Sequence, residues 1–147
     1  ASRMNIYLDT SALVKRYIAE VGSSEVAQWI AGAGLVATSL VTCAEANAAF
    51  ARAVRTNSIS QSVGEKAVKA LAGQWPRYMK TPVAERTVSR AAELAWSMGL
   101  RGYDAIHLAS AELLQSALGA PVILVTYDRQ LAAAAQQIAL EIRPSVS

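Results

Sequence analysis

The stretch PVILVTYDRQLAAAAQQI, residues 121–138, combines a buried strand with an amphipathic helix that follows it directly. Residues 121–126 form a nearly unbroken apolar run rich in β-branched side chains, which is typical of a strand buried on both faces of a parallel sheet. Asp128 comes next, and residues 129–138 have the apolar spacing of a short helix. The stretch therefore predicts a strand, an acidic residue and a helix in the order found in α/β folds.

The start of the chain has the same order of strand, acidic residue and helix. Residues 5–8, NIYL, are a short apolar run that ends at Asp9, and residues 11–19 carry apolar side chains at helical spacing. Two separate segments thus predict a strand that ends at an aspartate just before a helix.

Strands and helices alternate along the rest of the chain. We expect helices at residues 23–32, capped by Ser23 or Ser24, and at 40–56, 58–75, 86–98 and from about 102 onward, with strands at 35–38, 82–83 and 140–143. Alternation of this kind indicates a parallel sheet with helices on both faces. The predicted fold class is a three-layer α/β/α fold with a central, mostly parallel sheet.

The composition is that of one globular domain. The chain has 147 residues, of which 53% are hydrophobic, and this is enough for a full core. We interpret residues 1–3 as a cloning remnant and residues 4–147 as a single domain. No apolar run approaches the roughly 20 residues needed to span a bilayer, and no cationic leader precedes Met4. We therefore expect a cytoplasmic protein without a membrane partner.

Charge and metal-ligand content restrict the chemistry further. The formal net charge is +3, and the basic residues are dispersed, which permits a polyanionic partner without requiring one. The single cysteine, Cys43, and the single histidine, His107, exclude an internal disulfide and a zinc site built from several such side chains. Any bound metal must therefore be held by oxygen ligands.

The stretch LRGYDAIHLASA, residues 100–111, places a carboxylate on an apolar helix face. At helical spacing, Asp104 shares a stripe with Leu108 and Ala111, so it should face the interior. A carboxylate in an apolar interior costs several kcal/mol unless it is paired. Asp104 therefore needs a partner, a metal ion or a helix-capping role, and aspartate is among the best N-cap residues.

Four acidic residues are expected at one edge of the predicted sheet. In a parallel α/β sheet, each helix that follows a strand begins at the edge where the strands end. Asp9 and Asp128 end strands, and Glu45 and Asp104 lie near the starts of helices. Carboxylates gathered without compensation repel one another, so a cation such as magnesium or manganese would stabilise the group. Capping or an Asx-turn remains the alternative for the aspartates, and an exposed surface position the alternative for Glu45.

Three further polar residues lie near these acids in the sequence. Ser11, two residues after Asp9, and Thr126, two before Asp128, could orient carboxylates or a metal-bound water. An N-cap and a strand end are their alternative roles. We expect His107 to be a packed or surface helix residue and not a ligand.

The residues at four places together resemble the PIN-domain nucleases, most closely the VapC-type toxins of toxin–antitoxin pairs. These are DTSALVK at 9–15, Glu45, RGYDAIHLASA at 101–111 and TYDRQLA at 126–132, and the resemblance extends over the chain from Met4. It implies an acidic site with supporting polar residues, formed by Asp9, Glu45, Asp104 and Asp128 with Ser11 and Thr126. It further implies a magnesium- or manganese-dependent endoribonuclease, homodimers, and inhibition by a cognate antitoxin whose tail crosses the active edge.

The mechanism expected for such a site is hydrolysis by a metal-activated water. One or two Mg²⁺ or Mn²⁺ ions held by the four acids would activate water for in-line attack on an RNA phosphodiester. Basic residues next to these segments could contact phosphates or be solvated surface charges: Lys15, Arg16, Arg101 and Arg129.

Other functions fit the sequence less well. An aspartate after the first strand also marks haloacid-dehalogenase-like phosphatases, but those need a second aspartate where this chain has Ser11. Receiver domains need paired acids after the first strand, which this chain lacks, and that interpretation leaves Asp104 unexplained. The main alternative is a catalytically inactive module on the same fold that binds RNA or a partner protein.

Overall fold

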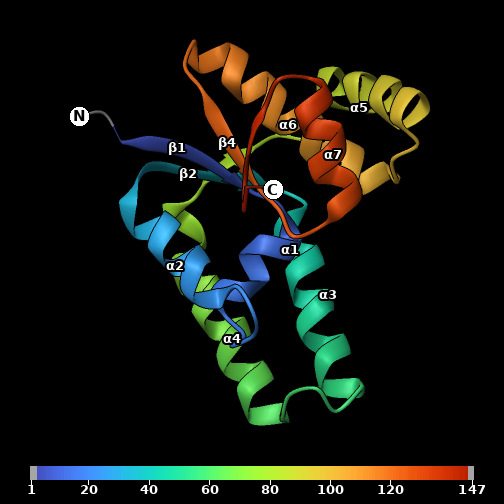
Figure 1. Ribbon diagram of the computed structural model, residues 1–147. Helices are drawn as coiled ribbons and strands as arrows, with labels where there is room; N and C mark the ends of the chain where they lie inside the picture. The colour runs from blue at the N-terminus through green and yellow to red at the C-terminus, as the bar shows by residue number, and fades with distance from the viewer. Residues whose placement is uncertain (1–2, 146–147) are drawn as a thin grey trace.

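A five-stranded parallel sheet forms the centre of the computed structural model, which describes residues 3–145 (Figure 1). Its strands are β1 (Met4–Leu8), β2 (Ala33–Ser39), β3 (Met79–Thr81), β4 (Val122–Val125) and β5 (Glu141–Arg143). Their spatial order is β3–β2–β1–β4–β5, and every neighbouring pair is parallel. The order reverses between β1 and β4, and open α/β sheets bind ligands outside the strand ends at such a switch point.

Helices cover both faces of the sheet (Figure 1). One layer contains α1 (Thr10–Leu13), α2 (Ser23–Gly32), α3 (Thr42–Arg55) and α4 (Gln61–Gln74). The opposite layer contains α5 (Glu85–Met98), α6 (Gly102–Leu118) and α7 (Arg129–Gln137). The predicted three-layer α/β/α fold with a parallel sheet is thus confirmed.

Alternating side chains of the central strands explain why both faces need helices. In β1, Ile6 and Leu8 belong to the core under α1 to α4, whereas Tyr7 belongs to the core under α5 to α7. Strand β4 alternates in the same way, and all four of its residues are buried. Successive strand residues point to opposite faces, so a strand without polar alternation must be covered on both.

The helices α3 and α4 form a hairpin that extends beyond the sheet (Figure 1). Ser60 caps α4, since its Oγ accepts a hydrogen bond from the Val63 amide at 3.1 Å. Phe50 of α3 and Leu71 of α4 are both buried in the core on this side of the sheet. This packing anchors the start of α3, and with it Glu45, at the carboxyl ends of the strands.

The first two predicted helices differ from the observed ones. The helix expected at residues 11–19 ends at Leu13 and continues only as a 3-10 turn, η1 (Val14–Arg16). Neither Ser23 nor Ser24 is the N-cap of α2, because Gly22 occupies that position with a φ of 95°. A side chain at Gly22 would also contact the Tyr127 ring at 2.8 Å, so both the backbone and the packing favour glycine there.

Two further boundaries were predicted wrongly. The short strand expected at residues 82–83 lies at Met79–Thr81, directly before Pro82, which has no amide hydrogen to donate. The strand expected to begin at Leu35 begins at Ala33.

No helix within residues 3–145 is long and apolar enough to cross a membrane. Ala1 and Ser2 of the expected cloning remnant lie outside the described residues.

Candidate active site

Asp9 is the buried centre of the polar cluster at the carboxyl ends of the strands. Its side chain directly follows β1, and the residue is 3% exposed. Ser11 Oγ donates to Asp9 Oδ1 at 2.8 Å, and Thr126 Oγ1 donates to Oδ2 at 2.5 Å. The Ala12 amide donates to Oδ1 at 2.9 Å, so Asp9 also caps α1. Burial raises the pKa of the Asp9 carboxyl, although the nearby His107 and these hydrogen bonds oppose that shift.

Ser11 and Thr126 join the segments that follow β1 and β4. The Tyr127 amide donates to Ser11 Oγ at 2.9 Å, and the Asp128 amide donates to Thr126 Oγ1 at 3.1 Å. The Asp128 side chain accepts from the Leu131 amide at 2.9 Å and caps α7. Asp9 and Asp128 therefore each cap a helix, and they also lie at the carboxyl ends of two neighbouring strands.

Asp104 lies in the first turn of α6 and does not cap it. Arg101 is the N-cap residue, so the capping interpretation of Asp104 is wrong. Burial raises the pKa of the Asp104 carboxyl, and the charges of Asp128 and Asp9 raise it further, while His107 and Arg101 oppose the shift. Asp104 is thus close enough to Asp9 and to Asp128, from two other segments, for their charges to act on it.

Glu45 is held by two neighbours that the sequence did not indicate. Its Oε1 accepts from Thr10 Oγ1 at 2.6 Å and from His107 Nε2 at 2.8 Å. Burial tends to raise the pKa of the Glu45 carboxyl, but the hydrogen bonds from His107 and Thr10 outweigh it, so the pKa lies below its usual value. Glu45 is therefore ionised at neutral pH.

His107 is buried on α6, which confirms the packed alternative predicted for it, but its hydrogen bonds were not predicted. The residue is 2% exposed, and its Nδ1 lies 2.9 Å from the Tyr7 hydroxyl. The sequence held one indication of this polar role. His107 lies three residues after Asp104, which places both side chains on one side of α6.

Two surface hollows open beside the acidic residues. A cleft of about 590 Å³ is lined by Glu45, Arg101, Gly102, Tyr103, Asp104 and Ile106. A second hollow of about 560 Å³ includes Asp128 and Arg129 in its lining. Glu45, Asp104 and Asp128 are thus accessible to a ligand in these hollows.

The four basic candidates occupy different positions. Arg101 and Arg129 are exposed in the hollows that contain Asp104 and Asp128. Lys15 instead donates to Glu20 at 3.1 Å and to the Val21 carbonyl at 2.7 Å, and its ammonium lies 4.5 Å from the Tyr127 ring centre. Arg16 lines a separate hollow with Tyr78. Only Arg101 and Arg129 are thus available to a ligand at the acidic cluster.

The donor chemistry of the cluster fits a divalent cation. Its ligands would be carboxylate oxygens, which magnesium and manganese prefer, and a cation would relieve the repulsion among the aspartates. Within residues 3–145, no three His, Cys, Asp or Glu side chains form a ready-made cage. Magnesium commonly binds through one or two carboxylates and keeps several waters, so a site for it does not need such a cage.

Comparisons with known proteins identify relatives for nearly the whole chain. Residues 6–137 match the model of the PIN domain. The chain is 30% identical over 141 residues to a protein named Ribonuclease VapC45, and 36% identical over 140 residues to Ribonuclease VapC35, both of Mycobacterium tuberculosis. These alignments cover 95% of both chains for VapC45, and 93% of this chain and 94% of the relative for VapC35.

Solved structures share the fold at lower identity. PAE2754 from Pyrobaculum aerophilum has a TM-score of 0.65 and 21% identity, and the match covers 95% of this chain and 83% of that one. VapBC-5 from Mycobacterium tuberculosis, described as a member of a toxin–antitoxin family, has a TM-score of 0.59 and 20% identity, with 95% and 97% covered. At these identities the structural likeness concerns the fold.

The raised pKa of Asp104 predicts a measurable pH dependence of stability. Between the unfolded and folded pKa values of this carboxyl, the folded chain binds more protons than the unfolded chain, so stability falls as pH rises through that interval. In EDTA, Asp104→Asn should therefore lose less stability than the wild type when pH is raised from about 4 to about 7. Urea unfolding at several pH values measures this, with the exposed Glu65→Gln of α4 as control. Parallel pH profiles for wild type and Asp104→Asn would contradict the prediction.

Proposed function

Because this chain belongs to the PIN domain family, in its VapC branch, we propose that it is a metal-dependent endoribonuclease and the toxin of a toxin–antitoxin pair. The observation that carries this proposal is the gathering of Asp9, Asp104 and Asp128 at the switch point of the sheet. Asp9 and Asp104 have raised pKa values, and none of the three aspartates forms a salt bridge within residues 3–145. A bound cation would relieve the repulsion that Asp9 and Asp128 exert on Asp104 at this edge of the sheet.

The proposed metal ligands are the acids that the sequence singled out: Asp9, Glu45, Asp104 and Asp128. One or two Mg²⁺ or Mn²⁺ ions, when bound, would supply a water activated for attack on phosphorus and would stabilise the departing 3′-oxygen. Hydrolysis by this route needs no covalent intermediate with the protein.

The remaining polar residues of the site orient the acids and receive the substrate. Ser11 and Thr126 each donate to the Asp9 carboxylate, which fixes its plane. Arg101 and Arg129 lie in the hollows beside Asp104 and Asp128 and can contact the phosphates that flank the cleaved bond. Such contacts position RNA without reading its sequence.

The relatives support an assignment of partners to this chain. The name Ribonuclease VapC given to the relatives supports RNA as the substrate, and the toxin–antitoxin description of VapBC-5 supports a protein antitoxin as the inhibitor. The family resemblance also supports a homodimer. Cellular RNA as the substrate would place the activity in the cytoplasm.

Replacement of the aspartates should abolish cleavage without unfolding the protein. With Mg²⁺ or Mn²⁺ and a labelled RNA pool, Asp9→Asn and Asp104→Asn should each lower the cleavage rate by on the order of 100-fold or more, because loss of even an outer partner of a metal ligand costs 10–100-fold. Melting temperatures report folding, Glu65→Gln is the matched surface control, and calorimetry with Mn²⁺ reports metal binding. A wild-type protein that binds RNA but cuts none at any metal concentration would instead be a binding module.

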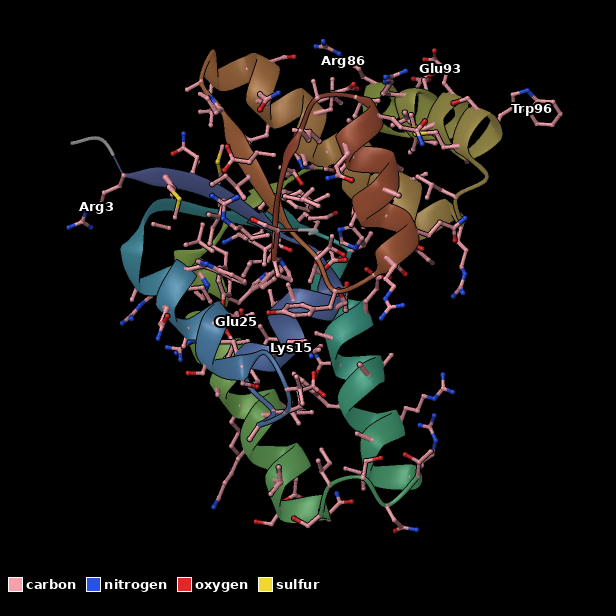
Figure 2. All side chains as sticks on the ribbon, in the orientation of Figure 1. Arg3, Lys15, Glu25, Arg86, Glu93 and Trp96 are labelled. Atoms are coloured by element: carbon pink, nitrogen blue, oxygen red, sulfur yellow. The ribbon has the colours of Figure 1, made fainter. Side chains whose placement is uncertain are left out.

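Arg101 should contribute to RNA affinity through charge. Arg101→Ala should weaken RNA binding similarly for different sequences, and should reduce the slope of log affinity against log salt by about one. Binding is best measured in the Asp9→Asn background, where the RNA stays intact. Arg86→Ala is the control, because Arg86 projects outward from α5, away from α3 (Figure 2). An unchanged salt slope for Arg101→Ala would remove Arg101 from the RNA contact surface.

A further inference from the structure

A buried chain of hydrogen bonds connects the core of the sheet to Glu45. It begins at Tyr7 in the middle of β1, which is 0% exposed, and passes through His107 of α6. It ends at Glu45 Oε1, which lies 2.8 Å from His107 Nε2. The chain therefore joins one residue from each of β1, α6 and α3, and so connects the sheet to both helical layers.

The chemistry of Glu45 sets the direction of its hydrogen bond with His107. The Glu45 carboxylate can only accept, so Nε2 carries a proton and donates to Oε1. Burial raises the pKa of Tyr7 far above its usual value, so its hydroxyl keeps its proton. That hydroxyl can donate to Nδ1 or accept from it, and in either case the hydrogen bond fixes the orientation of the ring.

The hydrogen bonds to Glu45 all fall on one of its two oxygens. Thr10 and His107 both donate to Oε1, and within residues 3–145 no hydrogen bond reaches Oε2. Glu45 lines the same cleft as Asp104, and its side chain is 26% exposed. One oxygen is thus fixed from behind, and the other remains free to bind a ligand in the cleft.

We propose that His107, oriented by Tyr7, is a positioning residue that holds the Glu45 carboxylate with Oε2 free for a cation at the acidic cluster. This inference rests on the proposed function for the role of Glu45 as a ligand. A metal-binding carboxylate on a long, flexible side chain loses affinity when its orientation is not fixed, and outer hydrogen bonds supply that fixation. Tyr7 contributes because its hydroxyl, hydrogen-bonded to Nδ1, fixes the orientation of the imidazole ring.

The single histidine makes the hydrogen-bond geometry measurable without any metal. The chain has one histidine, so the two imidazole nitrogens of ¹⁵N-labelled protein give one unambiguous pair of NMR signals. In EDTA we expect Nε2 to carry a proton that is protected from exchange, because Glu45 accepts it. In Tyr7→Phe the Nδ1 signal should shift because Nδ1 loses its hydrogen-bond partner. An Nε2 without a proton in the wild type could not donate to Glu45 and would overturn the proposal, whatever the protein does to RNA.

Metal affinity then tests the consequence for Glu45. Calorimetry with Mn²⁺ should show an affinity about 10- to 100-fold lower for His107→Leu than for the wild type. His107→Gln, whose amide can donate near the position of Nε2, should recover most of it, and Tyr7→Phe should fall between. Thr87→Val removes a buried hydroxyl on α5 whose one hydrogen bond within residues 3–145 is to the Pro82 carbonyl, and this variant should bind Mn²⁺ like the wild type.

The outcomes separate this inference from the proposed function. If the wild type binds Mn²⁺ and cuts RNA, and folded His107→Leu binds Mn²⁺ with the affinity of the wild type, His107 does not position Glu45 and the proposed function stands. Should His107→Leu fail to fold, Tyr7→Phe carries the comparison, and wild-type affinity in that variant would overturn the proposal. If the wild type neither binds Mn²⁺ nor cuts RNA, the proposed function fails and the positioning role fails with it, even where Nε2 carries the expected proton.

Discussion

The site depends on a buried carboxylate at the end of the central strand. Asp9 is 3% exposed, and a charge in that position is tolerated only because Ser11, Thr126 and the Ala12 amide all donate to it. These donors come from α1 and from the segment after β4, so the geometry of Asp9 also ties two strands together. The hydrogen bonds offset only part of the cost of burial, and the pKa of Asp9 remains raised. The fold thus holds a carboxyl group at one fixed point, where a cation would favour its charged form.

The topology brings the other acids to that point. Asp128 follows β4, the neighbour of β1, and Asp104 opens the long helix that leads into β4. Glu45 comes from the opposite layer, on a hairpin whose buried residues fix the start of α3. Because helices of both layers begin near the carboxyl ends of the strands, residues distant in sequence can act there on one ligand. The hydrogen bonds of His107 add a direct connection between the two layers.

The sequence predicted the parts of this structure that depend on periodicity. The unbroken apolar run of β4, and the aspartates that follow β1 and β4, suffice to predict a parallel sheet and the convergence of acids at its edge. Local boundaries were less predictable, since Gly22 begins α2 for reasons of backbone conformation and contact with Tyr127. The roles of His107 and Thr10 could not be predicted, because their partner Glu45 lies 62 and 35 residues away, and side-chain pairing over such separations leaves no local pattern.

The central claim is that the gathered carboxylates form a cation site, and anomalous diffraction from crystals soaked in Mn²⁺ tests it most directly. The account predicts an anomalous peak at the carboxyl ends of β1 and β4, within about 2–2.3 Å of oxygens from at least two of the acids Asp9, Glu45, Asp104 and Asp128. In Asp104→Asn crystals that peak should weaken or vanish. Ordered acidic side chains with no peak among them at saturating Mn²⁺, or a peak only elsewhere on the surface, would contradict the account.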